Sequence, residues 1–265
     1  MKVLVVTPTI GSPELVDALI SVRAQAFREL EGVEVMHILM VDGAEYEEKV
    51  IDALIVAEDE LEEPGYALKN KVVVWPYNTG GKGYYGHKLY AAAAMLVTPD
   101  IDWVLFLDQD NWYEPNHIES VVMKASLEDL DFSFSLRKFY TTDKRFYADD
   151  NCASLGPWTA WPREMGGHNL VDTGCYCFKG SFITSKGHIC NMTWGADITF
   201  FESIMATARY GTTGERTFCY RMGADGARKS VEERAFIDKW NAYAANRFGG
   251  KYPWERQVEN PGGGL

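Results

Sequence analysis

Short apolar runs alternate with amphipathic segments along the first 107 residues. The runs at 3–7, 33–41, 71–75 and 103–107 each have the length of a buried β-strand. Between them, apolar residues recur at helical spacing over 12–27, 45–60 and 84–97. Strands that alternate with helices form a mainly parallel sheet covered on both faces. The pattern therefore predicts an α/β fold with a single Rossmann-like sheet.

The second half of the chain is less regular. Its pattern predicts helices over 115–127, 195–210 and 231–248 and strands over 132–139, 171–178 and 217–221. Residues 140–169, rich in Gly, Pro and Trp, form a stretch too long for a simple connection, which is typical of a functional loop. No repeat or linker divides the chain, so we expect one domain over 1–265.

Two carboxylates directly follow the last of the four apolar runs, in the segment Asp108-Gln109-Asp110-Asn111. Side chains two positions apart on an extended strand point to the same side, so Asp108 and Asp110 would lie together. Open α/β sheets bind ligands at the carboxyl ends of their strands, and carboxylates are ligands for hard cations. A solvated turn that merely closes the strand is the alternative.

Composition narrows the classes of partner. The chain has 26 basic and 38 acidic side chains and a net charge of -12, which argues against a broad electrostatic contact with nucleic acid or an anionic membrane. The apolar run at the amino terminus is short and reaches Pro8, which favours a strand over a signal peptide. No stretch has the length of a membrane span, so we expect a cytoplasmic protein.

The 5 cysteines are odd in number and scattered, which favours reduced thiols over a disulfide framework. A zinc site is an alternative for one group of them. A hairpin would bring together Cys175, Cys177, His188 and Cys190.

Four segments, taken in order, closely resemble the family 2 glycosyltransferases of GT-A fold. They are Thr7-Pro8-Thr9, Val41-Asp42-Gly43, Asn78-Thr79-Gly80-Gly81-Lys82 and Leu107-Asp108-Gln109-Asp110-Asn111. The resemblance covers residues 2–112 well and 170–205 more loosely. It implies a nucleotide-sugar-binding half at 1–112, a smaller acceptor-binding half at 113–250 and a tail at 251–265.

This resemblance also implies roles for individual residues. Asp42 would contact the base of the donor, Asp110 would bind Mn²⁺ or Mg²⁺ directly, and Asp108 would orient the ribose or reach the metal. His188, with His168 as a competitor, would complete the metal site. The residues expected around the donor are Thr7, Pro8, Thr9, Asp42, Asn78, Gly80, Gly81, Lys82, Asp108, Gln109, Thr173 and Gly174.

A transferase that inverts the anomeric centre needs a base for the attacking hydroxyl. In this family the base is an acid at the start of a helix after the Asp pair, and Trp194-Gly195-Ala196-Asp197 occupies the corresponding place. Asp197 is the candidate base. The alternatives are that Asp197 only caps the helix, or that Glu202 is the base.

The resulting expectation is transfer of one sugar from a nucleotide-diphosphate sugar, with uridine as the expected nucleoside, to a hydroxyl acceptor with inversion. The Gln-x-x-Arg-Trp signature of processive synthases is missing from the chain. A lipid-linked glycan, lipopolysaccharide or protein all stay open as acceptors, a nucleobase is disfavoured by the charge, and no pattern indicates an oligomeric state.

Two other classes of protein remain. A sugar-phosphate nucleotidyltransferase would share the sheet, but it needs a glycine-rich loop after the first strand that residues 7–12 do not offer. A non-catalytic nucleotide-sugar or glycan-binding protein would keep the fold without the chemistry.

Overall fold

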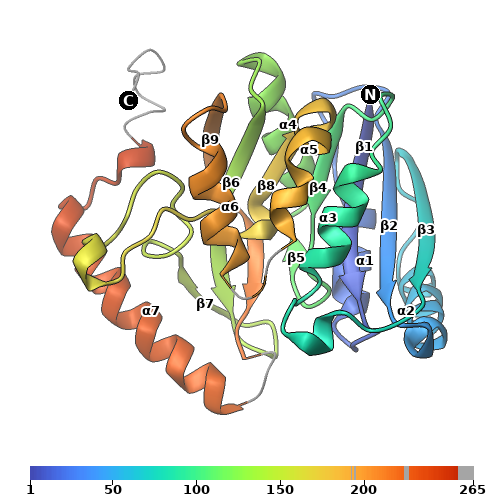
Figure 1. The fold of residues 1–265 in the computed structure, drawn as a ribbon, viewed down its shortest axis with the longest axis horizontal. Helices are drawn as coiled ribbons and strands as arrows, with labels where there is room; N and C mark the ends of the chain where they lie inside the picture. The colour runs from blue at the N-terminus through green and yellow to red at the C-terminus, as the bar shows by residue number, and fades with distance from the viewer. Residues whose placement is uncertain (192, 194, 224–226, 256–265) are drawn as a thin grey trace.

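The computed structural model describes residues 1–191, 193, 195–223 and 227–255. It does not describe the side chains of Lys82 and of residues 227–230. Within this part of the chain, one sheet has the strand order β3-β2-β1-β4-β8-β6-β9-β5, and β7 pairs with β6 beside that path. Figure 1 shows the sheet between layers of helices. The α/β class expected from the sequence is confirmed.

The strands are β1 (Lys2–Thr9), β2 (Glu34–Asp42), β3 (Ala67–Trp75), β4 (Trp103–Phe106), β5 (Trp112–Tyr113), β6 (Phe132–Tyr140), β7 (Phe146–Asp149), β8 (Tyr176–Lys179) and β9 (Tyr210–Arg221). The α-helices are α1 (Leu15–Arg23), α2 (Glu47–Glu60), α3 (His87–Met95), α4 (His117–Leu127), α5 (Gly180–Lys186), α6 (Ala196–Ile204) and α7 (Ala227–Phe248). Short 3₁₀ turns are η1 (Ala44–Tyr46), η2 (Gly80–Lys82), η3 (Arg163–Met165), η4 (Thr173–Cys175) and η5 (Gly187–Cys190).

The first four strands are parallel, and their order reverses at β1. Strands β2 and β3 lie on one side of β1, whereas β4 pairs with its other side. Such a switch point opens a crevice at the carboxyl ends of the two strands, which is where open α/β sheets bind ligands. The carboxyl ends of β1, β2 and β3 lie at the lower edge of the sheet in Figure 1.

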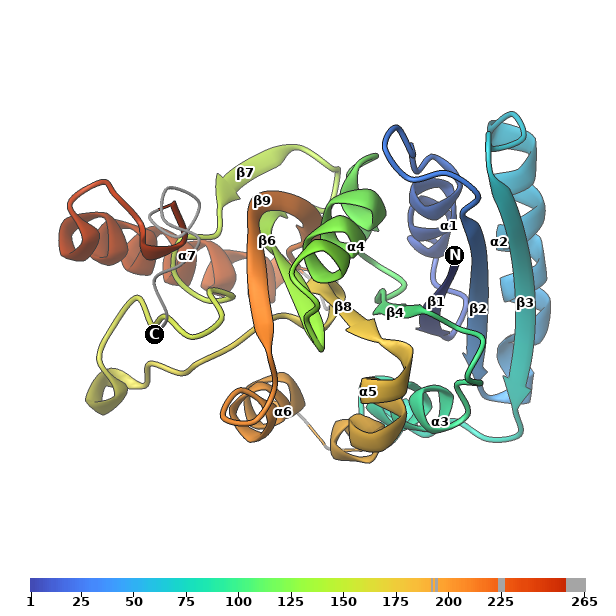
Figure 2. The same ribbon diagram turned by 90° about the horizontal axis from the view of Figure 1, so that it is seen from above.

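Helices cover both faces of the sheet. Figure 2 shows α1 and α4 on one face and α3, α5 and α6 on the other, with α7 beyond β7 at the far end. β1 and β4 are therefore buried on both faces, and Val5, Val6, Val104 and Leu105 have no exposed surface. This burial explains why their sequences are apolar without alternation.

The second half of the sheet differs from the expected mainly parallel order. β8 runs antiparallel to both β4 and β6, while β9 is parallel to β6. The strand expected at 171–178 is reduced to β8, because the Asp172 carboxylate accepts the Gly174 N–H (3.0 Å) and caps η4. The helix expected to reach residue 210 ends at Ile204, since Tyr210 already pairs with Phe132.

No helix of the described residues is both long enough and apolar enough to cross a membrane. All five cysteines are buried free thiols. No group of three or more His, Cys, Asp or Glu side chains in the described ranges is arranged to hold a metal, so the zinc alternative for Cys175, Cys177, His188 and Cys190 has no site. Residues 256–265 of the expected tail lie outside the described chain.

Candidate active site at the switch point of the sheet

A cleft of about 820 Å³ opens at the carboxyl ends of β1, β2 and β4 and extends to the ends of β6 and β9. It brings together segments that are far apart in the sequence. The expected site residues that line it are Pro8, Thr9, Asp42, Asn78, Gly80, Gly81, Asp108, Gln109, Asp110, Thr173 and Asp197. The cleft is also lined by Ile10, Tyr46, Tyr85, Gly86, His87, Asn111, Arg137, Leu170, Asp172, Gly195, Ile198, Tyr220, Arg221 and Glu233.

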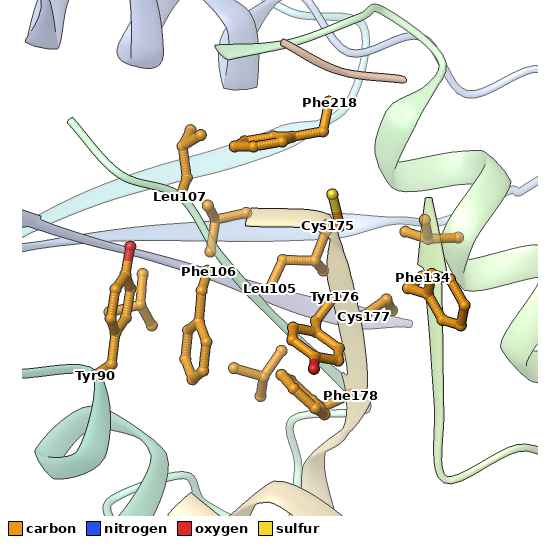
Figure 3. Close-up of a cluster of buried hydrophobic side chains, with 14 of the residues drawn as sticks. Tyr90, Leu105, Phe106, Leu107, Phe134, Cys175, Tyr176, Cys177, Phe178 and Phe218 are labelled. Atoms are coloured by element: carbon orange, nitrogen blue, oxygen red, sulfur yellow. The ribbon is translucent and has the colours of Figure 1, made fainter. Parts of the chain in front are cut away.

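Asp108 is held in a fixed orientation at the end of β4. The hydroxyl of Tyr90 donates to Asp108 Oδ1 (2.8 Å), and the amide of Asn111 lies 3.4 Å from Oδ2. Tyr90 is itself fully buried against Phe106, with their ring centroids 4.5 Å apart. Figure 3 shows this layer of aromatic side chains continuing to Phe178. A rigid apolar support thus places the carboxylate at the base of the cleft.

Gln109 joins the ends of β1 and β4 across the switch point. Its Oε1 accepts the hydroxyl of Thr9 (2.7 Å) and the backbone N–H of Ile10 (3.0 Å). These contacts use the side-chain oxygen, so Gln109 shapes the wall of the cleft. The turn after β4 is fixed from the other side by Arg221, whose backbone N–H donates to Asn111 Oδ1 (2.9 Å).

Asp42 orders the loop that follows β3. Its Oδ1 accepts the N–H of Thr79 (2.6 Å) and its Oδ2 accepts the N–H of Gly80 (2.6 Å). A Cβ at Gly80 would lie 2.9 Å from Asp42 Oδ2, so glycine allows this close approach. Asn78 closes the same loop by accepting the N–H of Gly81 (2.7 Å). The loop is therefore built into the wall of the cleft by Asp42.

Asp197 lies in the first turn of α6 and lines the cleft. The N-cap of this helix is Gly195, and the Asp197 carboxylate accepts the adjacent N–H of Ile198 (2.9 Å). Burial, with the negative charge of Asp172 second, raises the pKa of Asp197 to about 6. The rival Glu202 instead accepts a hydrogen bond from Arg163 (3.0 Å) and does not line the cleft. Asp197 is therefore a carboxylate of the cleft wall with a raised pKa, which is the kind of group that can act as a general base.

A buried cation that the sequence did not lead us to expect lies on β6, in the wall of the cleft. Arg137 is 8% exposed, and its Nε donates to Asp150 Oδ2 (2.5 Å) while Nη1 donates to Asp172 Oδ2. These two carboxylates compensate its desolvation. A charged residue inside the apolar run 132–139 was the available signal for this site.

The carboxylates of the cleft repel one another. Burial, followed by the charges of Asp110 and Asp172, raises the pKa of Asp108 to about 8. A divalent cation relieves such repulsion, and carboxylate oxygens are the ligands that Mg²⁺ and Mn²⁺ prefer. The pair Asp108 and Asp110 therefore fits such a cation chemically. Two protein ligands leave coordination positions for the oxygens of a substrate.

Four expected site residues lie elsewhere or are not described. Thr7 is buried behind the cleft, with its hydroxyl 2.9 Å from His37 Nε2. Gly174 is also buried and does not line the cleft, and a Cβ there would lie 2.2 Å from Phe218 Cε2. His188 is exposed on η5 and is not part of the cleft wall. The side chain of Lys82 lies outside the described residues.

Solved structures share this architecture. S. aureus TarS 1–349 is similar over 99% of this chain and 76% of its own length, with a TM-score of 0.57 and 14% identity. The chain therefore has the GT-A fold. TarS 1–349 in complex with UDP matches with a TM-score of 0.57 and 14% identity over 98% of this chain and 75% of that one. The TarS 1–349 complex with UDP-GlcNAc matches with a TM-score of 0.54 and 14% identity, over 97% of this chain and 69% of that one.

Comparison of the sequence with protein-family models finds no match. Comparison with curated proteins finds no relative either. The likeness to TarS is therefore one of fold.

Proposed function

We propose that this chain is a metal-dependent glycosyltransferase that moves one sugar from a uridine diphosphate sugar to a hydroxyl acceptor with inversion. One observation carries the proposal. A single cleft at the switch point collects Asp42, the pair Asp108 and Asp110, and Asp197 from separate segments. The fold is shared with TarS, which has been solved in complex with UDP-GlcNAc.

The nucleotide belongs on the side of the cleft formed by β1, β2 and the loop at Asn78. Pro8 and Thr9 end β1, and the loop ordered by Asp42 closes the opposite wall. Tyr46 also lines this side and lies near Asn78, whose Nδ2 is 3.4 Å from the tyrosine hydroxyl. Flat and polar groups together suit a base and a ribose.

The diphosphate belongs at Asp108 and Asp110, which would hold Mn²⁺ or Mg²⁺. The metal, when bound, neutralises the charge that develops on the departing nucleoside diphosphate. Tyr90 and Asn111 keep the Asp108 carboxylate turned toward the cleft by their hydrogen bonds.

Asp197 takes the proton of the attacking hydroxyl at one of its carboxylate oxygens. Its pKa of about 6 means that it is ionised at neutral pH and still basic enough to accept the proton. Thr173 and Ile198 line the cleft beside it and would exclude water from this region. Direct attack on the anomeric carbon from the side of Asp197 produces inversion.

Hydrolysis and binding of UDP-GlcNAc, with and without Mn²⁺, test the proposal. We expect a thermal shift that requires the metal, since a ligand at about 100 times its Kd stabilises a protein by about 2.7 kcal/mol. Asp110→Ala should abolish this shift and Asp197→Asn should retain it. Slow release of free sugar by the unaltered protein, lost in both variants, separates a transferase from a pure binding protein. A metal-independent shift that is unchanged in Asp110→Ala would contradict the metal role.

A further inference from the structure

Arg137 has one nitrogen, Nη2, for which the described residues provide no hydrogen-bond partner. Its Nε and Nη1 are bound by Asp150 and Asp172, whereas Nη2 makes no hydrogen bond within the described part of the chain. Nη2 is also not among the buried atoms sealed from solvent without a partner, and Arg137 lines the cleft. A buried guanidinium therefore presents two unused N–H groups to the cleft.

The guanidinium is fixed in place before any substrate binds. Its central carbon lies 4.8 Å from the ring centroid of Phe139 and 4.9 Å from that of Tyr220. Asp150 is in turn held by the N–H groups of Cys152 (2.9 Å) and Ala153 (2.8 Å). A donor that is held this firmly loses little entropy when it binds a ligand.

The position of Arg137 indicates that the ligand of its Nη2 is the acceptor. It lies on β6, away from the loop at Asn78, and its charge acts on Asp197, the proposed base. The acceptor hydroxyl must contact that base, so the acceptor passes close to Nη2.

Charge then selects the kind of acceptor. Arg137 is already balanced by two carboxylates, Asp150 and Asp172. The second arginine of the cleft, Arg221, uses Nε, Nη1 and Nη2 on Asp110 O, Thr142 O and Asp17. Mn²⁺ at Asp108 and Asp110 would balance that pair. Among the described residues of the cleft wall, these two cations then face Asp42, Asp172 and Asp197, with the negative charge of the donor diphosphate beside them. An anionic acceptor would meet net repulsion there.

We propose that Arg137 is an acceptor-binding residue whose Nη2 donates to a hydroxyl of an uncharged sugar, and that the cleft discriminates against acceptors carrying a carboxylate or phosphate beside that hydroxyl. The inference rests on the proposed function and adds the chemical class of the acceptor. It predicts a preference that the fold alone does not dictate.

The test compares matched acceptors with the unaltered protein, a nucleotide-sugar donor that it hydrolyses, and Mn²⁺. Methyl glucoside, galactoside and mannoside are each paired with the corresponding methyl uronate, which differs only by its carboxylate. We expect transfer to at least one neutral glycoside with kcat/KM about ten-fold or more above that of its uronate. Equal or better transfer to the uronate, or transfer to none of the neutral glycosides, would overturn the inference.

Arg137→Lys provides the second arm. It keeps a cation between Asp150 and Asp172 but removes Nη2, so KM for the neutral glycoside should rise about ten-fold or more, with a smaller change in kcat. Arg209→Lys, at a surface pair with Asp129, is the matched control and should change neither constant. An unchanged KM in a folded Arg137→Lys protein would overturn the inference. If this variant does not fold, the acceptor comparison alone decides.

Different results would refute the proposed function and the proposed role of Arg137. A protein that neither binds nor hydrolyses any donor refutes the proposed function. A protein that turns over donor but prefers the uronate refutes only the role of Arg137.

Discussion

The hydroxyl of Tyr90 tests whether the Asp108 carboxylate is held ready for a metal-bound diphosphate. In Tyr90→Phe only the hydroxyl is lost, because the ring keeps its place against Phe106. The hydrogen bond removed is 2.8 Å long and ends on Asp108 Oδ1. A hydrogen bond to a charged group contributes about 1.5–3 kcal/mol, and losing the hydrogen-bond partner of a metal ligand typically weakens metal binding about 10- to 100-fold.

The assay is a titration of Mn²⁺ in the presence of UDP, followed by the electron paramagnetic resonance signal of free Mn²⁺. We expect the Kd for Mn²⁺ to rise about 10-fold or more in Tyr90→Phe, since Asp108 then loses its shorter hydrogen bond and keeps the longer contact with Asn111. Tyr113→Phe is a matched control. Tyr113 is also buried, and its hydroxyl donates to the backbone oxygen of Phe106 (2.7 Å), not to a carboxylate.

The control separates the specific effect from general loss of stability. Tyr113→Phe should lower the free energy of unfolding by about 1 kcal/mol and leave the Kd for Mn²⁺ unchanged. If Tyr90→Phe binds Mn²⁺ as tightly as the unaltered protein, Asp108 does not depend on Tyr90 and the reasoning is refuted.

Three further predictions concern the base, the core and packing. Because burial raises the pKa of Asp197 to about 6, the rate should rise with pH through this value and then level off, and Asp197→Asn should lower kcat about 10²- to 10⁴-fold; a flat pH profile would count against Asp197. Burial also lowers the pKa of His37 to about 3 from its usual 6.5, so only the unfolded chain takes up a proton as the pH falls below 6.5. The free energy of unfolding by urea should therefore drop by about 2 kcal/mol per such group between pH 6.5 and 5, and His37→Gln should show a smaller drop than the unaltered protein. Gly174→Ala should cost about 1–3 kcal/mol, measured by thermal denaturation, because its Cβ would meet the Phe218 ring at 2.2 Å; an unchanged melting temperature would show that the ring moves aside freely.

The sequence predicted the position of those cleft residues that directly follow a β-strand. Asp108 and Asp110 follow an apolar run directly, and Asp42 ends another, so periodicity alone placed them at one edge of the sheet. The structure adds what Asp42 binds, which is the backbone of Thr79 and Gly80. That contact depends on the path of the loop after β3 and has no pattern of its own.

The part of the cleft wall around Arg137 was harder to predict because it depends on the pairing of strands that are far apart in the sequence. Arg137 reaches Asp172 only because β6 pairs antiparallel with β8, and Tyr220 joins them because β9 runs parallel to β6. Tyr90 lies in a segment with high helix propensity, where the sequence predicts an aromatic residue of the hydrophobic core. Its hydroxyl reaches Asp108 because of the way α3 packs on the sheet, which the sequence pattern does not give.

A crystal structure with UDP and Mn²⁺ tests the central claim most directly. The account predicts the uracil on the side of Asn78 and Tyr46, and an anomalous Mn²⁺ peak between the diphosphate and the carboxylates of Asp108 and Asp110. Nucleotide bound outside this cleft, or a diphosphate held there by side chains with no metal at Asp110, would contradict it.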